Sequence, residues 1–128
     1  MVRDVKMQFD GKEYSLLYCG RAMLVAQDTF TDMSVLDIVG DRTVAGWDNL
    51  CKLAGILAEH GEEVRRRRKY TPQDMLDAEY LQIAALPHEL VMVRDAVFNA
   101  VMLGLEREEK ENNGEIDLGL QELQKKSE

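Results

Sequence analysis

TVAGWDNLCKLAGILAEHGEEV, residues 43–64, is the stretch around which the rest of the chain is organised. At about 100° per residue, its apolar side chains cover an arc of roughly 200°. An ordinary surface helix needs an apolar stripe of only about 100°. We therefore expect a helix, capped by Asp41 or Thr43, that at least two other elements cover. It also carries Trp47, the one tryptophan of the chain.

A β-hairpin is predicted before this helix. Val5, Met7 and Phe9 alternate with polar residues, and Tyr14, Leu16 and Tyr18 continue the alternation after Asp10-Gly11. Asp-Gly between two alternating runs is a strong hairpin signal, because a type I′ turn needs positive φ at both central residues. The strands should span about 3–9 and 12–18. A lone hairpin is only marginally stable in water, so its apolar face must lie on helices.

Further helices are predicted on both sides of the central one. Two short helices, 21–31 and 35–39, should precede it, with Ser34 capping the second and Gly40 at its C-terminal end. Thr71-Pro72 and Leu86-Pro87 look like helix starts, giving helices at about 72–85 and 88–109. The expected fold is mostly α, a small domain of four to five helices with an N-terminal hairpin.

The domain should span residues 1–110, and an acidic segment should follow at 111–128. Asn112-Asn113-Gly114 ends the last helical pattern. The segment is too short and polar to add much core, so we expect it to be disordered in the free protein. Its Ile116, Leu120 and Leu123 also fit one helical face, so the alternative is that it folds on a partner.

The last predicted helix is apolar around its whole circumference, interrupted only by Glu89, Arg94, Asp95 and Asn99. Such a helix must be buried on all sides. Either it is the central helix of the fold, or part of it meets another chain, which is the interpretation we favour. The residues expected to contact a partner or another subunit are Leu90, Val97, Phe98, Val101, Met102 and Leu105.

The charge is −8 overall and is unevenly distributed. Residues 1–70 carry 11 basic and 11 acidic side chains, whereas residues 71–128 carry 5 and 13. This argues against nucleic acid as the main partner of the second half. No secretory signal or membrane-spanning stretch is evident, and the two cysteines suggest no disulfide framework. We expect a cytoplasmic protein without membrane contact.

The residues of this sequence do not form a recognisable catalytic or metal-binding motif. Cys19, Cys51, His60 and His88 lack the paired spacing of zinc ligands. The carboxylate pairs Glu62/Glu63 and Asp74/Asp77 look like helix-surface charges without an apolar pocket that would raise a pKa. No phosphate-binding or dinucleotide-binding loop is present. We therefore expect no enzyme activity, no catalytic or metal site and no cofactor.

The basic run Arg65, Arg66, Arg67, Arg68 and Lys69 is the sharpest charge feature. It could contact nucleic acid or an acidic partner. It could instead be a charge-pairing patch, within the chain through Glu62 and Glu63 or between subunits of an oligomer. Cations near a helix C-terminus are also favoured by the helix dipole, so a plain solvated loop is the third interpretation.

The hairpin sequence Phe9-Asp10-Gly11-Lys12-Glu13-Tyr14-Ser15-Leu16, followed by Arg21-Ala22-Met23 and short helices, resembles the tail assembly chaperones of long-tailed (siphovirus-type) phages and prophages. The resemblance covers about residues 7–108 and lies in order and pattern. It implies a self-associating protein of the host cell cytoplasm, absent from the mature virion. It also implies that the protein binds the long, apolar tape measure protein and keeps it soluble during tail assembly. The alternatives are a small nucleic-acid-binding regulator that uses residues 65–69, and a helical adaptor.

Overall fold

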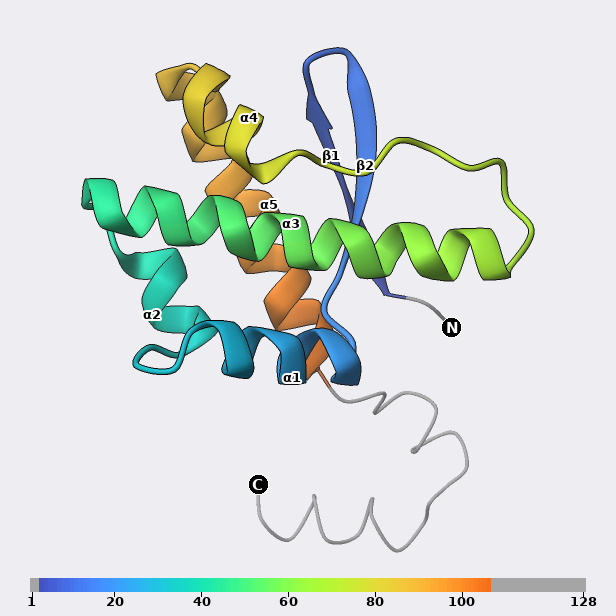
Figure 1. Cartoon of the computed structure of the whole chain (residues 1–128), viewed down its shortest axis with the longest axis horizontal. Coiled ribbons are helices and arrows are strands. Elements are labelled where there is room, and N and C mark those ends of the chain that lie inside the picture. The colour runs from blue at the N-terminus through green and yellow to red at the C-terminus, as the bar shows by residue number, and fades with distance from the viewer. Residues whose placement is uncertain (1–2, 107–128) are drawn as a thin grey trace, which may run out of the picture.

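The computed structural model describes residues 3–106, which form a mostly helical domain with an N-terminal hairpin, as the sequence predicts. The acidic segment at 111–128 lies outside the described residues. Figure 1 shows the order of the elements along the chain. Their bounds are β1 Asp4–Phe9, β2 Lys12–Leu17, α1 Gly20–Thr29, α2 Val35–Gly40, α3 Val44–Arg67, α4 Ala78–Ala84 and α5 Pro87–Leu105.

The hairpin has the predicted two-residue turn. Asp10 and Gly11 have φ angles of 55° and 75°, so both lie in the left-handed region that a type I′ turn requires. Phe9 pairs with Lys12 across this turn, and Met7 pairs with Tyr14. Met7, Phe9, Tyr14 and Leu16 are buried, whereas Lys6, Gln8 and Glu13 on the opposite face are exposed. One face of the hairpin therefore belongs to the core, and the other is exposed at Lys6, Gln8 and Glu13 but buried at Ser15 and Leu17.

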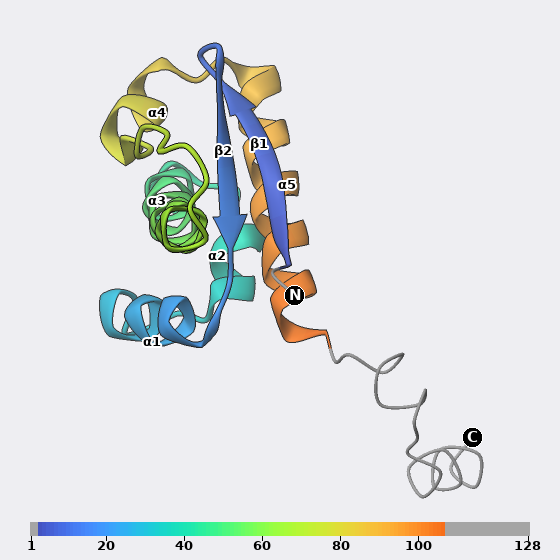
Figure 2. The same cartoon turned by 90° about the vertical axis from the view of Figure 1, so that its right-hand side faces the viewer.

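The hairpin lies between α3 and α5, with β2 nearer to α3 and β1 nearer to α5 (Figure 2). Thr43 caps α3, and its Oγ1 accepts a hydrogen bond from the Gly46 N–H at 3.0 Å. Trp47 donates from Nε1 to the Gln82 carbonyl of α4 at 3.2 Å. The fully buried side chains of α3 include Leu50, Leu53 and Leu57. As predicted, several elements cover this helix.

A glycine lets α3 come very close to the hairpin. A Cβ on Gly61 would overlap the Ser15 carbonyl oxygen of β2. Ser15 lies opposite Lys6 in the ladder, so its backbone groups point away from β1 and toward α3. The C-terminal half of α3 therefore covers the outer edge of β2. Gly104 of α5 similarly approaches the Tyr18 carbonyl just after β2.

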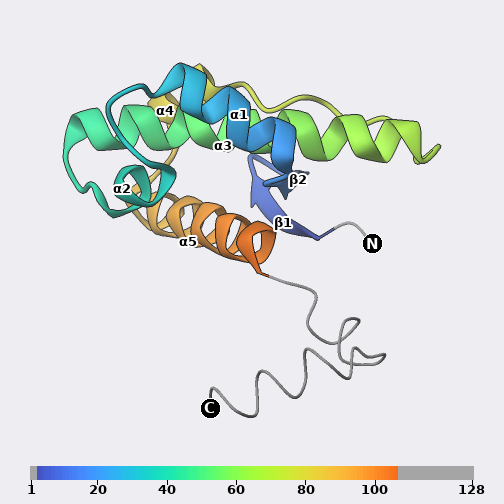
Figure 3. The ribbon, with the colours of Figure 1, turned by 90° about the horizontal axis from the view of Figure 1, so that it is seen from below.

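The short helix α2 lies beside both α3 and α5 (Figure 3). Ser34 caps it as predicted, and its hydroxyl accepts from the Asp37 N–H at 3.1 Å. Gly40 is the last helical residue rather than the residue after the helix. The buried Arg94 of α5 donates to the carbonyls of Val39 and Asp41 at 2.9 and 3.1 Å. This arginine ties α5 to the end of α2.

The helix predicted at 72–85 is wrong over its first six residues. Residues 70–77 are not helical, and α4 begins only at Ala78 with Asp77 as its cap. The Gln73 N–H binds the Glu62 carboxylate at 2.7 Å, and the carbonyls of Thr71 and Gln73 accept from Arg65 and Arg66. These backbone groups are bound to α3 and are not available for a helical turn.

The last helix is shorter than predicted and joins the two ends of the domain. It begins at Pro87, within the predicted helix start Leu86-Pro87, and ends at Leu105 rather than near residue 109. Arg3 donates to the Leu103 and Glu106 carbonyls at 3.2 and 2.7 Å. The end of α5 therefore lies beside the start of β1.

Gly61→Ala should destabilise the domain by about 3 kcal/mol, because the new methyl group would meet backbone that cannot move aside. Urea denaturation followed by circular dichroism measures the loss. Gly40→Ala is the matched control, since a Cβ there meets nothing within 4 Å. It should change the free energy of unfolding by less than about 1 kcal/mol. Equal effects of the two substitutions would contradict the close approach.

Candidate protein-binding surface

α5 carries an exposed apolar stripe along the face that turns away from the domain. We define the α5 stripe as Val91, Phe98, Met102 and Leu105, which are 52%, 43%, 44% and 52% exposed. Their spacing of seven, four and three residues places them along one side of a helix. Asp95 completes the same row and is exposed. Apolar side chains of this size in a continuous row are typical of a contact surface for another helix.

The other face of α5 belongs to the core. Val93, Ala96, Val97, Ala100 and Val101 are buried in the same cluster as the hairpin and α3. The helix is thus not buried on all sides: its inner half is packed in the core, and its outer half, also apolar, is exposed.

The structure separates the six residues predicted to contact a partner. Phe98, Met102 and Leu105 are exposed, and Leu90 is half-buried. Val97 and Val101 were wrongly assigned, because both are completely buried inside the domain. Val91 was missed, although its position seven residues before Phe98 places it on the same side of the helix.

A hollow of about 490 Å³ continues the surface from the end of the α5 stripe to the hairpin. Met102, Leu103 and Leu105 line it from α5, and Val5 lines it from β1. Asn99 and Glu106 are its polar lining residues. The hollow is mostly apolar and open, so it could take apolar side chains of another segment.

The basic run divides into two parts. Arg65 and Arg66 bind the Glu62 carboxylate at 3.0 and 2.8 Å, and the Arg65 guanidinium lies over the Tyr70 ring, 5.6 Å from its centroid. Arg67, Arg68 and Lys69 are exposed and form no ion pair with any residue between 3 and 106. Glu63, the second predicted partner, pairs with Arg21 of α1 instead. Within residues 3–106, charge pairing of the basic run therefore uses only Arg65 and Arg66.

Glu62 is buried, which contradicts the prediction of an ordinary surface charge. Burial by itself raises the pKa of its carboxyl group. The hydrogen bonds from the Gln73 N–H, Arg66 and Arg65 outweigh burial, so the pKa of Glu62 lies below its usual value. The carboxylate stays charged and holds the segment after α3 against that helix.

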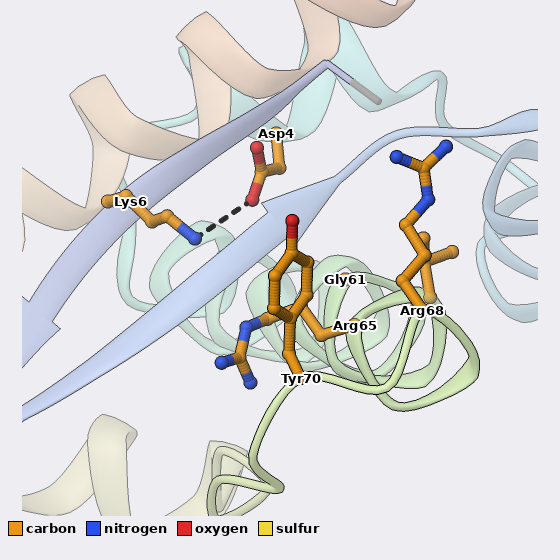
Figure 4. A pocket seen from close by; sticks show the side chains of 7 residues that line it. Asp4, Lys6, Gly61, Arg65, Arg68 and Tyr70 are labelled. Carbon is orange, nitrogen blue, oxygen red and sulfur yellow. Dashed lines mark hydrogen bonds and ion pairs between the residues drawn. The ribbon is translucent and has the colours of Figure 1, made fainter. Parts of the chain in front are cut away.

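A second hollow, of about 340 Å³, lies between the start of β1 and the end of α3 (Figure 4). Asp4 and Lys6 line it from the strand, and Arg65, Arg68 and Tyr70 line it from the end of α3 and the turn after it. Lys69 precedes Tyr70 with a φ of 70°, which turns the chain back over the helix. Lys6 binds Asp4 and the Ser15 hydroxyl, so Arg68 is the cation here without an ion pair in the described part.

The buried histidine and cysteine have surroundings that indicate a role in the core. His60 is buried, and its Nδ1 lies 2.8 Å from the Ile56 carbonyl oxygen. Cys51 is buried, and burial, with Asp48 nearby, raises the pKa of its thiol to about 12. No group of three or more metal-ligating side chains occurs within residues 3–106. No helix in this range is long and apolar enough to cross a membrane.

Comparison of the chain with known proteins finds no matching family model, no similar curated protein and no similar solved structure. The resemblance to phage tail assembly chaperones thus stays a prediction from the sequence.

Val101→Asp should destabilise the domain by about 3–5 kcal/mol, because it places an unpaired charge in the core. Its neighbour Met102 is the control, since Met102→Asp lies on the outer face and should change stability by less than about 1 kcal/mol. Thermal denaturation of both variants distinguishes the inner from the outer half of α5. Two equally stable variants would contradict the burial of Val101.

Glu62→Gln should cost about 2 kcal/mol of stability at pH 7, because the amide loses the charge-assisted hydrogen bonds. The native pKa is lowered, so this contribution is fully present above the unfolded pKa of about 4.3 and is lost as the pH falls through the native pKa. Urea denaturation from pH 7 down to pH 3 should show the two proteins converging. Glu63→Gln, at an exposed ion pair, should cost at most about 1 kcal/mol.

Proposed function

We propose that this chain is a phage tail assembly chaperone that binds the tape measure protein and keeps it soluble during tail assembly, by protein–protein contacts and as an oligomer. The α5 stripe is the observation that carries the proposal. A small domain that leaves these apolar side chains exposed along one helix has a surface suited to another apolar helix. The sequence resemblance supplies the identity of that helix.

The chemistry of the α5 stripe fits a holdase for helical chains. Methionine is unbranched and adapts to irregular partners, and phenylalanine supplies a large apolar contact. A single charged side chain, Asp95, lies in the same row as the α5 stripe, so the surface does not demand one exact partner sequence. Binding by such a surface lowers the concentration of free, aggregation-prone partner through mass action.

Self-association would use the same exposed apolar surface, the α5 stripe. A second copy could place its own α5 stripe against the first, and the two surfaces would then be equivalent by symmetry. The partner helix would have to compete with that contact or extend it. Exposed Arg67, Arg68 and Lys69 could also pair with acidic side chains of a neighbouring copy, which retains the predicted role of the patch between subunits.

Co-expression with a fragment of the tape measure protein encoded beside this chain tests the proposal. The fragment should be soluble and co-purify with the wild-type chain. Phe98→Asp should weaken the complex by about 30-fold or more, as expected for a central aromatic contact. Binding is measured by titration of the purified partners.

Leu24→Asp on α1 is the matched control, because Leu24 is an equally apolar side chain and is 60% exposed outside the α5 stripe. It should leave binding unchanged. A fragment that stays insoluble with the wild-type chain, or equal losses with both variants, would contradict the assignment.

A small nucleic-acid-binding regulator is the second candidate, because Arg67, Arg68 and Lys69 are exposed and unpaired within residues 3–106. Three phosphate contacts would give weak binding with a shallow salt dependence. Gel-shift assays with DNA at low salt test it, with Arg67→Glu/Arg68→Glu as the variant. The regulator would be favoured if the wild-type chain binds DNA in a salt-sensitive way, if the variant does not bind DNA, and if the chain binds no tape measure fragment.

A further inference from the structure

The outer edge of β1 is an open sheet edge. The two-residue turn makes Phe9–Lys12 a hydrogen-bonded pair, and such pairs alternate along an antiparallel ladder. Asp4, Lys6 and Gln8 therefore direct their backbone N–H and C=O groups away from β2. No hydrogen bond within residues 3–106 reaches these backbone groups, whereas α3 covers the outer edge of β2 at Gly61.

The two sides of this open edge differ in chemistry. On the core side lies the apolar hollow between Val5 and the end of α5, lined by Met102, Leu103 and Leu105. On the solvent side, Lys6 and Gln8 are exposed, and Lys6 pairs with Asp4 of the same face. The guanidinium of Arg68, which forms no ion pair within residues 3–106, lies across the second hollow from Lys6 (Figure 4). An added strand would meet an apolar surface with one set of side chains and polar, partly cationic groups with the other.

The C-terminal segment of the chain contains a matching alternation. In Glu115-Ile116-Asp117-Leu118-Gly119-Leu120-Gln121, every second residue is apolar and the residues between are acidic, amide or glycine. Period-two alternation is the pattern of a half-buried strand. An added strand would therefore present Ile116, Leu118 and Leu120 to one side and Glu115 and Asp117 to the other. This segment lies outside the described residues, so its sequence alone enters the argument.

The segment starts in the right place to reach this edge. Arg3 holds the Leu103 and Glu106 carbonyls, so the described chain ends beside the first residue of β1. Residues 107–114 can span at most about 28 Å. β1 is six residues long, about 20 Å. The linker is therefore long enough to bring residues 115–121 alongside β1 in either direction.

We propose that residues 115–121 of the same chain add to the outer edge of β1 as a third strand. Ile116, Leu118 and Leu120 lie over the apolar hollow at the end of α5, and Glu115 and Asp117 lie on the side of Lys6. Backbone hydrogen bonds to Lys6 and Gln8 provide affinity, and the hollow selects the apolar side chains. A lysine on an open edge opposes unspecific pairing. Arg68, which forms no ion pair within residues 3–106, is the cation on this side that an acidic strand can meet.

This docking covers Met102 and Leu105, which also belong to the α5 stripe. The C-terminal segment thus competes for one end of the surface that a partner helix would use, and a partner must displace it there. The strand addition itself does not depend on the proposed function, and its test uses no partner protein.

Residue-resolved amide hydrogen exchange in the full chain tests the proposal. The outward amides of Lys6 and Gln8 should be protected in the wild type. Leu118→Asp should accelerate their exchange by about ten-fold or more, because it releases the added strand. The amide of Met7 pairs with Tyr14 and serves as the internal reference, with unchanged exchange.

Leu123→Asp is the matched control. A strand at 115–121 does not use Leu123, whereas a helical segment would place Leu123 on one face with Ile116 and Leu120. Exchange at Lys6 and Gln8 should therefore be the same in this variant as in the wild type. Fast exchange of these amides in the wild type, or loss of protection in Leu123→Asp instead of Leu118→Asp, would overturn the proposal.

Dilution distinguishes the chain's own segment from that of a second copy. Protection by residues of the same chain is independent of protein concentration, because the linker fixes the effective concentration. Protection at Lys6 and Gln8 that falls on hundred-fold dilution would assign the strand to a neighbouring copy and overturn the same-chain assignment.

Discussion

The close contact between α3 and β2 at Gly61 is the constraint on which the other parts of the structure depend. Gly61 admits the Ser15 carbonyl, and the next residue, Glu62, binds the backbone of Gln73 and two arginines. Two adjacent residues therefore fix the hairpin on one side of α3 and the segment leading to α4 on another. Because α3 occupies the outer edge of β2, the core face of the hairpin remains for α5, and no strand within residues 3–106 pairs with the outer edge of β1. The surfaces available for partners follow from this one contact.

Short sequence motifs correctly predicted the turns and helix ends that depend on interactions between residues close in sequence. Asp10-Gly11 predicted the turn, Ser34 and Thr43 predicted helix starts, and Pro87 marked the start of α5. Thr71-Pro72 failed as a helix start because Glu62, Arg65 and Arg66 at the end of α3, 6 to 11 positions earlier, bind the backbone groups of Thr71 and Gln73. Glu62 was expected on the surface, but this segment folds back onto it. Its burial results from the segment after α3, and no pattern within α3 encodes it.

The candidate surface was only partly predictable, because α5 is apolar on both halves. Hydrophobic periodicity identifies the buried face of a helix when many polar residues occupy the exposed face. On the exposed face of α5, Asp95 and Asn99 are too few to identify it clearly. Val101 and Met102 are neighbours in sequence but differ by about 100° around the helix, and one is in the core while the other is exposed. Burial of Arg94 adds to the ambiguity, since its charge suggests the outer face while its hydrogen bonds to Val39 and Asp41 place it inside. The position of the hairpin decides which half of α5 is covered.

The pairing of β1 with α5 has a consequence for how the chain folds. Arg3 and its partners Leu103 and Glu106 are 100 and 103 positions apart, so this contact closes nearly the whole domain. Contacts of high sequence separation form slowly, because the entropy of loop closure must be overcome first. The hairpin and α3 can meet early, whereas the apolar face of β1 stays open until α5 arrives. During synthesis, β1 must therefore wait for α5 before its apolar face is covered.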